Sequence, residues 1–188
     1  MLTLNMSFNP AFSGSKIVYL AARDLAADNS GWQALGTWNV PGAAATPTAA
    51  ANLTPARGAG IDQTFTFTFT DTHGWQDLGV VDILINNSLD GRQACYLAYS
   101  RPLNTLYLVN DAGTALLPGI VLSPSSSVAN SQCTVTGFTT TGGNTLTLTF
   151  SLGFSPSFAG NRVTYMAARD VTDIVNSGWQ AMGSWTVQ

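Results

Sequence analysis

Few residues of this chain have side chains suited to catalysis, and His73 is its only histidine. A Ser-His-Asp triad would have to use His73 as general base, with Asp71 or Asp77 beside it and a serine from elsewhere. The segment from Thr70 to Gly74 is typical of a turn that leaves a strand, and no GxSxG motif is present in the sequence. We therefore predict no catalytic residues and no enzyme, and keep a small hydrolase centred on His73 as the weakest alternative.

A hexapeptide of the form Gly-Trp-Gln-x-Leu/Met-Gly occurs three times, at 31–36, 74–79 and 178–183. An aromatic face beside an amide suits a sugar ring, so these side chains are candidates for carbohydrate binding. In the structural alternative, each tryptophan plugs an end of the fold while the glutamine satisfies loop backbone groups. We favour the structural role because the motif occurs at two unlike places in one unit. The candidates are Trp32, Gln33, Trp75, Gln76, Trp179 and Gln180.

Three tyrosines, Tyr96, Tyr99 and Tyr107, lie in the segment 94–110, which we expect to form a hairpin. If exposed, they would form an aromatic patch for a glycan or a protein ligand. If buried, they would be ordinary strand residues, since aromatic cross-strand pairs stabilise sheets. Both alternatives remain open, with the buried one favoured.

Calcium is the one cofactor that the carboxylates bring into consideration. The candidate ligands are the pairs Asp24 with Asp28 and Asp170 with Asp173, which occupy equivalent loops. Calcium needs six or more oxygens, and two carboxylates per loop fall short of that number. The adjacent Arg23 or Arg169 could pair with these acids instead. We therefore expect no metal or other cofactor, with calcium as a weak alternative.

The two cysteines, Cys95 and Cys133, have no CxxC motif or Cys/His partner of the kind that binds a metal. A disulfide and two separate buried thiols are both compatible with their spacing. We predict the disulfide because a composition low in charge and rich in threonine is typical of extracellular proteins.

A long internal repeat determines how these residues are positioned. Residues 2–40 return at 148–187, offset by 146 positions and then by 147, and 20 of the 39 aligned positions are identical. Self-similarity over a whole unit is the signature of a repeat array. We therefore divide the chain into the C-terminal part of a preceding repeat (1–40), a junction (41–50) and a complete unit (51–188).

Composition excludes several classes of protein. Charged residues make up 9% of the chain and hydrophobic residues 45%, glutamate is absent, and the net charge is −3. A helical protein is not expected, and the few basic residues are too dispersed to bind nucleic acid. No apolar run approaches the roughly 18 residues of a membrane-spanning helix, so we expect no membrane insertion. We expect a secreted or cell-surface protein, with any signal peptide upstream of Met1.

Period-2 alternation predicts an all-β protein, and Gln63 to Thr70 (QTFTFTFT) shows it most clearly. Turn residues separate eight or nine such runs, a pattern typical of an antiparallel β-sandwich of two sheets. The remaining runs are 80–85, two strands within 94–109, 132–135, 145–154, 162–169 and 183–187.

The segment Tyr165–Asp170 followed by Asn176–Trp179, and its copy Tyr19–Asp24 with Asn29–Trp32, resemble the last hairpin of bacterial immunoglobulin-like repeats. The resemblance implies an Ig/fibronectin-III-like tandem repeat module of a large secreted or surface protein. The unit exceeds the roughly 100 residues usual for the fold, which leaves room for an extra hairpin at 94–110.

The expected function is a non-catalytic structural or interaction module, adhesin-like or a spacer. The alternative is a carbohydrate-binding module that uses exposed tryptophan or tyrosine faces. Residues 2–40 should supply about three strands, near 2–8, 16–22 and 36–40. They could pack on the complete unit, pair with the same segment of a second chain, or exchange with 148–187. Because such strands would expose an apolar face and open edges, we predict self-association through residues 2–40.

Overall fold

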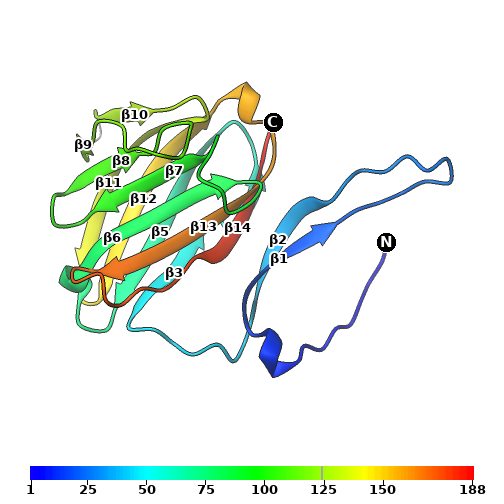
Figure 1. The fold of residues 1–188 in the computed structure, drawn as a ribbon, viewed down its shortest axis with the longest axis horizontal. Coiled ribbons are helices and arrows are strands. Elements are labelled where there is room, and N and C mark those ends of the chain that lie inside the picture. The colour runs from blue at the N-terminus through cyan, green and yellow to red at the C-terminus, as the bar shows by residue number, and fades with distance from the viewer. Residues whose placement is uncertain (124) are drawn as a thin grey trace.

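The computed structural model describes residues 1–123 and 125–188, without the side chains of Phe138 and Thr140. Strands dominate these residues, and three short 3-10 helices accompany them. Two sheets pack face to face (Figure 1), which confirms the predicted all-β antiparallel sandwich.

Five strands form the first sheet, in the order β10 (Ser127–Ala129), β11 (Cys133–Gly142), β12 (Thr145–Phe154), β5 (Asp62–Asp71) and β3 (Thr48–Thr54). The second sheet has seven, in the order β4 (Arg57–Ala59), β14 (Gln180–Val187), β13 (Gly160–Asp170), β6 (Leu78–Asn86), β7 (Cys95–Ser100), β8 (Thr105–Leu108) and β9 (Ile120–Val121). The 3-10 helices are η1 (Pro10–Phe12), η2 (Trp75–Asp77) and η3 (Pro156–Phe158). Neighbouring strands run antiparallel except for β14 and β4, which are parallel.

Alternation along the strands builds the core between the two sheets. On β5, Phe65, Phe67 and Phe69 point inward and are buried, while the intervening threonines are partly exposed. Leu148 and Phe150 of β12 face the same core, and β12 lies beside β5. A sheet with one buried face and one solvated face shows this pattern.

The predicted disulfide between Cys95 and Cys133 is present. It joins β7 of the seven-stranded sheet to β11 of the five-stranded sheet, so it ties the two layers together through the core. Both cysteines are buried.

The N-terminal residues form a separate hairpin of β1 (Gly14–Leu20) and β2 (Gln33–Val40), which projects from the sandwich in Figure 1. The predicted strand at 2–8 is wrong: these residues carry no strand assignment. Their counterparts in β12 hydrogen-bond to strands on both sides, and no strand of the described residues pairs with residues 2–8. The first strand of the sandwich, β3, begins at Thr48, inside the segment expected to be a junction.

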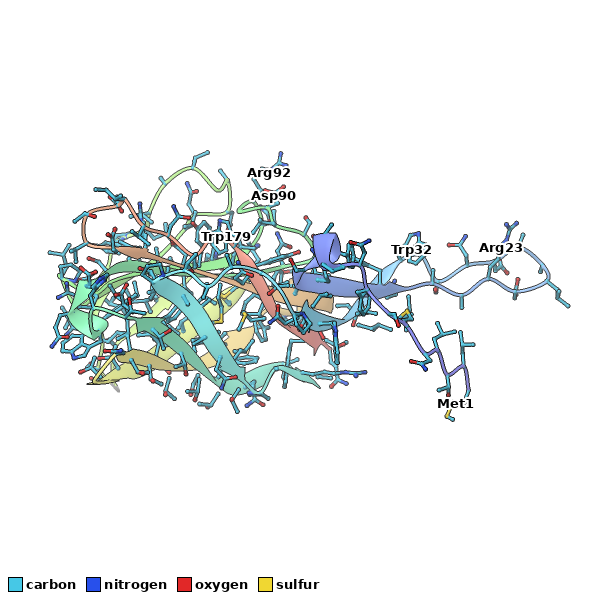
Figure 2. The ribbon with its side chains drawn as sticks, turned by 90° about the horizontal axis from the view of Figure 1, so that it is seen from below. Met1, Arg23, Trp32, Asp90, Arg92 and Trp179 are labelled. Carbon is cyan, nitrogen blue, oxygen red and sulfur yellow. A yellow bond between two sulfur atoms is a disulfide. The ribbon has the colours of Figure 1, made fainter. Side chains whose placement is uncertain are left out.

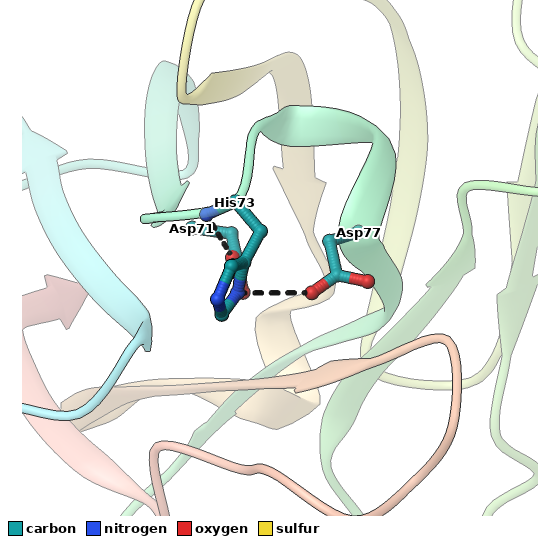
Figure 3. Close-up of side chains that lie close together, drawn as sticks. All are labelled: Asp71, His73 and Asp77. Atoms are coloured by element: carbon teal, nitrogen blue, oxygen red, sulfur yellow. Dashed lines mark hydrogen bonds and ion pairs between the residues drawn. The ribbon is translucent and has the colours of Figure 1, made fainter.

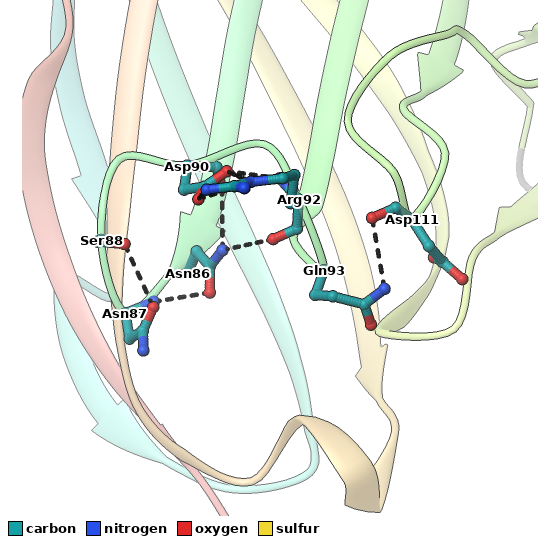
Figure 4. Close-up of polar contacts among 7 residues, drawn as sticks. All are labelled: Asn86, Asn87, Ser88, Asp90, Arg92, Gln93 and Asp111. Carbon is teal, nitrogen blue, oxygen red and sulfur yellow. Dashed lines mark hydrogen bonds and ion pairs between the residues drawn. The ribbon is translucent and has the colours of Figure 1, made fainter.

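The loop between β6 and β7 illustrates how polar side chains hold the turns of this fold (Figure 4). The Asn86 amide donates to the carbonyl oxygens of Asp90 and Arg92 at 2.9 and 3.1 Å. Arg92 also forms an ion pair with the Asp90 carboxylate, which lowers the pKa of Asp90 to about 2. These contacts are internal to the loop and leave it with a structural role.

No described helix has the length or the apolar character needed to span a bilayer.

Candidate functional site

A groove of about 710 Å³ lies on the outer face of the seven-stranded sheet. Alternation along β6, β7 and β8 sends Asp82, Tyr96 and Tyr107 to this face, while their sequence neighbours enter the core. Arg169 from β13 and Trp179 from the loop before β14 complete the lining. The groove therefore gathers three of the aromatic residues selected from the sequence together with three charged residues, Asp82, Arg169 and Asp173.

The loop that carries Trp179 is held by its own polar groups. The Asn176 side chain accepts from the N–H of Gly178 at 3.1 Å, and the Gln180 amide donates to the Ser177 carbonyl at 3.0 Å. Gly178 has a φ of 62°, a left-handed conformation that favours glycine. The Gly-Trp-Gln motif is thus a turn that sets the tryptophan in place, and the glutamine has the structural role considered above.

Trp179 packs edge-on against Tyr96, with ring centroids 5.8 Å apart and an interplanar angle of 71°. Both rings lie against a small apolar cluster that includes Leu84 and Tyr165. This geometry fixes the two aromatic side chains at one side of the groove. Preorganised aromatic rings of this kind suit the apolar face of a ring-shaped ligand.

Asp82 supplies the groove with a carboxyl group that is a weaker acid than an ordinary aspartate. Burial raises the pKa of Asp82 to about 6, against the opposing influence of Arg169 and of the Tyr96 hydroxyl, which lies 3.5 Å from Oδ1. The pKa of Tyr96 rises to about 12, chiefly through burial and then through the nearby Asp82. Below about pH 6, most molecules hold this carboxyl protonated, so it can donate as well as accept a hydrogen bond, whereas above that pH it is mostly an acceptor.

The other aromatic candidates lie apart from the groove. Tyr99 faces the core, is buried, and donates from its hydroxyl to Asn104 at 2.9 Å, so it is not a surface binding residue. Trp75 packs against the core at η2, with the Arg101 guanidinium 6.0 Å from its ring. Gln76 is exposed beside Trp75, and its backbone carbonyl accepts a hydrogen bond from the Arg101 guanidinium.

Trp32 lies on the projecting hairpin, whereas Trp179 lies on the sandwich (Figure 2). Gln33 is the first residue of β2 in the same hairpin. The Gln33 amide donates to the Ser30 carbonyl at 2.8 Å, which repeats the bond of Gln180. Trp32 is exposed. Its turn is the same as that of Trp179, so the two tryptophans differ in their surroundings and not in their local structure.

The groove residues Asp82 and Arg169 were not proposed as binding residues from the sequence. A signal for Asp82 was available: it is the one charged residue within the apolar run Val80–Ile85. A charged side chain between two apolar neighbours on a buried strand must be paired, desolvated or turned to a groove.

His73 lies in the turn after β5, close to two carboxylates (Figure 3). Its Nδ1 is 3.3 Å from Asp71 Oδ1 and 3.4 Å from Asp77 Oδ2. Asp71 is buried, accepts from the Thr48 hydroxyl, and accepts from the backbone N–H of His73 at 2.8 Å. Within the described residues no serine hydroxyl bonds to His73, and the arrangement closes the turn as the sequence indicated.

The same three side chains are the one group of described residues that brings three potential metal-ligating atoms within 4.8 Å of one another. Exposed acidic groups of this size are common without a metal, and the contacts just described give each carboxylate a role in the turn.

The calcium candidates bond to their own loops. Asp24 accepts from the N–H of Asp28, and Asp170 accepts from the Thr172 hydroxyl and the N–H of Ile174. The Thr172 bond is the main cause of the lowered pKa of Asp170. Asp173 pairs with Arg169 at 3.2 Å. Calcium binding stays the weak alternative to the prediction of no cofactor, and these contacts do not favour it.

A second candidate surface is the apolar face of the N-terminal hairpin. Its exposed side chains include Phe8, Phe12, Leu20 and Trp38, and residues 2–8 add Leu2, Leu4 and Met6. Exposed apolar side chains in such number mark interaction surfaces in folded proteins. Phe8 stacks on Phe12, Lys16 lies over the Phe12 ring, and Lys16 pairs with Trp38 across the hairpin. We call the side of the hairpin that carries Phe8, Phe12, Leu20 and Trp38 the open face.

We compared the chain with protein-family models, with curated proteins and with solved structures, and found no match in any of the three.

Proposed function

We propose that this chain is a non-catalytic structural and interaction module of the immunoglobulin-like repeat type, secreted or displayed at a cell surface, and that it acts through the open face. One observation carries the proposal. The chain holds two copies of the same hairpin, and the copy within the sandwich buries the very positions that the N-terminal copy exposes.

The two hairpins share their local structure in detail. β1 pairs with β2 from Gly14↔Val40, and β13 pairs with β14 from Gly160↔Val187, each with a register shift at the same aligned position. Isolated bridges join Arg23 with Asn29 and Arg169 with Asn176. Sequence repetition has therefore produced repetition of structure, and N-terminal residues 9–40 keep this conformation without the core that the other copy fills.

Exposure separates the two copies. Trp38 is 58% exposed and its counterpart Trp185 is 5% exposed, while Phe12 is 49% exposed and its counterpart Phe158 is 3% exposed. Each buried Phe or Trp side chain contributes about 1.5–3 kcal/mol to folding or binding. An open face that keeps several such side chains in water has a large free energy to gain from a partner.

The disulfide supports the proposed location, because disulfides persist in oxidising compartments outside the cytosol. In the absence of another partner, the open face of one molecule should associate with that of a second copy, as we expected for residues 2–40.

This proposal is tested by sedimentation equilibrium over a range of concentrations. We expect reversible, concentration-dependent association of the wild type. The double variant Phe12→Asp with Trp38→Asp should be monomeric with an unchanged disulfide and circular dichroism spectrum. Trp32→Asp, on the opposite face of the same hairpin, should associate like the wild type. A wild type that is monomeric at all concentrations and does not bind an apolar dye would contradict the proposal.

A carbohydrate-binding module is the second candidate, and the groove favours it. The Tyr96–Trp179 pair offers apolar ring faces, while Asp82 and Arg169 offer hydrogen-bonding groups. Retention on insoluble polysaccharides should fall sharply for Trp179→Ala and stay unchanged for Trp75→Ala, whose ring lies outside the groove. No retention on any polysaccharide by the wild type would remove this candidate.

A further inference from the structure

We propose that the open face has one specific occupant: a β-sheet segment of the same kind as residues 48–147 that has no closing hairpin of its own. We call residues 48–147 the acceptor segment, and residues 148–187 the closing segment. Residues 2–40 would then close a second sandwich. The inference rests on the proposed function, because it names the partner of the same surface.

The complete unit shows what an acceptor gives a closing segment. The edge of β13 pairs with β6 from Val163↔Asn86 to Asp170↔Leu78, and Leu148–Gly153 of β12 pairs with β5. The closing segment therefore completes both sheets of the sandwich.

Trp185 shows how specific the fit is. Its indole Nε1 donates to the Gly60 carbonyl at 2.9 Å, and its ring meets Phe65 edge-on at 5.1 Å. Gly58 lies under the ring, so closely that a Cβ there would be 2.2 Å from a ring carbon. The acceptor segment thus contains a seat for one tryptophan, made by Gly58, Gly60 and Phe65.

Residues 2–40 contain a tryptophan that could fill such a seat and a strand edge that could pair with such an acceptor. Trp38 stands at the position of Trp185. Among the described residues, no strand lies beside the edge of β1 that corresponds to the β6-pairing edge of β13. The cation over the phenylalanine ring is also repeated, with Lys16 4.6 Å from the Phe12 centroid and the Arg162 guanidinium 4.2 Å from that of Phe158.

The opposite face of the hairpin is already in contact with the sandwich. Ile17 and Ala34 pack in one apolar cluster with Val163 and Tyr165, and the Asn161 amide donates to the Gln33 side chain at 2.9 Å. This contact holds the hairpin with its core-facing side turned outward. The surface left free is therefore the one that matches an acceptor.

A second copy of this chain does not supply a free acceptor. Each chain carries one acceptor segment and two segments able to close it, and its tryptophan seat is filled by its own Trp185. If two identical chains exchanged segments, Trp38 of one chain could enter the tryptophan seat of the other only by displacing the Trp185 that already fills it. Any exchange among identical chains leaves as many closing segments without an acceptor as there are chains, so the matching occupant is an acceptor without a closing segment.

The experiment supplies that acceptor to the full chain by placing an additional copy of residues 48–147 directly before Leu2. The join reproduces the natural one, because Thr147 is followed by Leu148, the counterpart of Leu2. Covalent attachment gives the acceptor a high effective concentration. Amide hydrogen exchange followed by mass spectrometry measures the protection of backbone amides in residues 2–40 separately from that in residues 148–187.

We expect exchange at residues 17–22 to slow by about two orders of magnitude relative to the unextended chain, since a paired edge opens only by local unfolding. A second Cys95–Cys133 disulfide should form in the added copy. Unchanged exchange at residues 17–22, or an added copy without its disulfide, would overturn the inference.

A matched pair of glycine variants in the added copy sharpens the test. Gly58→Ala fills the tryptophan seat and should abolish the protection of residues 2–40 while residues 160–187 stay protected. Gly142→Ala, where a Cβ meets nothing within 4 Å, should leave the protection intact. Protection that survives Gly58→Ala would show a different contact and overturn the inference. If the unextended chain self-associates through the open face and the extended chain shows no protection, the proposed function stands and this inference fails.

Discussion

Asp82 determines how the groove responds to pH. Its native pKa of about 6 lies above the ordinary value of 3.8, because burial penalises the carboxylate. The folded state therefore binds this proton more tightly than the unfolded state does. The stability that this provides is fully present below about pH 4 and is lost as the pH rises through about 6.

Replacing the carboxyl with an amide removes this dependence. Asp82→Asn should raise the free energy of unfolding at pH 7.5 by about 1–3 kcal/mol, since the wild type then buries a charge. The gain should shrink toward zero below about pH 4. Chemical denaturation at several pH values measures both quantities, and a difference that does not vary with pH would contradict the assignment.

Gly58 is the residue whose size the Trp185 ring restricts most directly. Gly58→Ala in the unextended chain should lower the free energy of unfolding by about 1–3 kcal/mol through overpacking, because the ring is held by Phe65 and Gly60 and cannot move freely. Gly142→Ala is the control and should change the stability by less than about 0.5 kcal/mol. Equal effects of the two variants in urea unfolding would contradict the close packing of the Trp185 ring on Gly58.

At the scale of the elements, the sequence predicted the strands that alternate and missed those that do not. β5, β6, β12 and β13 lie where alternation or an apolar run placed them. β3 (TAAANLT) was missed because alanines give a weak alternating signal, and β4, β9 and β10 are two or three residues long. Pairing with a longer neighbour, and not local propensity, makes such short segments into strands.

The disulfide is the one covalent cross-link between side chains of the two sheets. Replacing both cysteines with alanine should lower the free energy of unfolding by about 3–4 kcal/mol, the value that loop entropy assigns to a closed loop of 38 residues. Denaturant titration of the double variant against the oxidised wild type measures this loss. A change below about 1 kcal/mol would contradict this expectation and would mean that residual structure keeps the two segments close together in the unfolded chain.

The candidate site was only partly visible in the sequence. Trp179 was a candidate from the Gly-Trp-Gln motif, and Tyr96 and Tyr107 were candidates from the predicted hairpin, but no sequence pattern indicated that the three lie in one groove. Whether Tyr99 faces the core depended on the register of its strand, because a shift of one residue moves every side chain to the other face of the sheet. Arg169 joined the groove through pairing of strands far apart in the chain, which no local pattern records.

At the scale of the whole molecule, the sandwich and the hairpin should be separable. Deleting residues 1–46 should leave a folded sandwich with its disulfide, because β3 begins at Thr48 and the core contains none of the deleted side chains. The loss of stability should stay within about 1–3 kcal/mol, since the deletion removes the small apolar contact of Ile17 and Ala34 and the hydrogen bond between Asn161 and Gln33. Thermal unfolding with and without the segment decides this, and a deletion that fails to fold would show that residues 1–46 are part of the core.

The central claim is that the N-terminal hairpin keeps its core-facing side open, and hydroxyl-radical footprinting of the tryptophans tests it most directly. At a concentration where sedimentation shows a monomer, Trp38 should be oxidised at a rate close to that of the exposed Trp32, while its counterpart Trp185 is protected. At higher concentration, association should protect Trp38 and leave Trp185 unchanged. Equal protection of Trp38 and Trp185 in the monomer would contradict the account, because the open face would then be closed within its own chain.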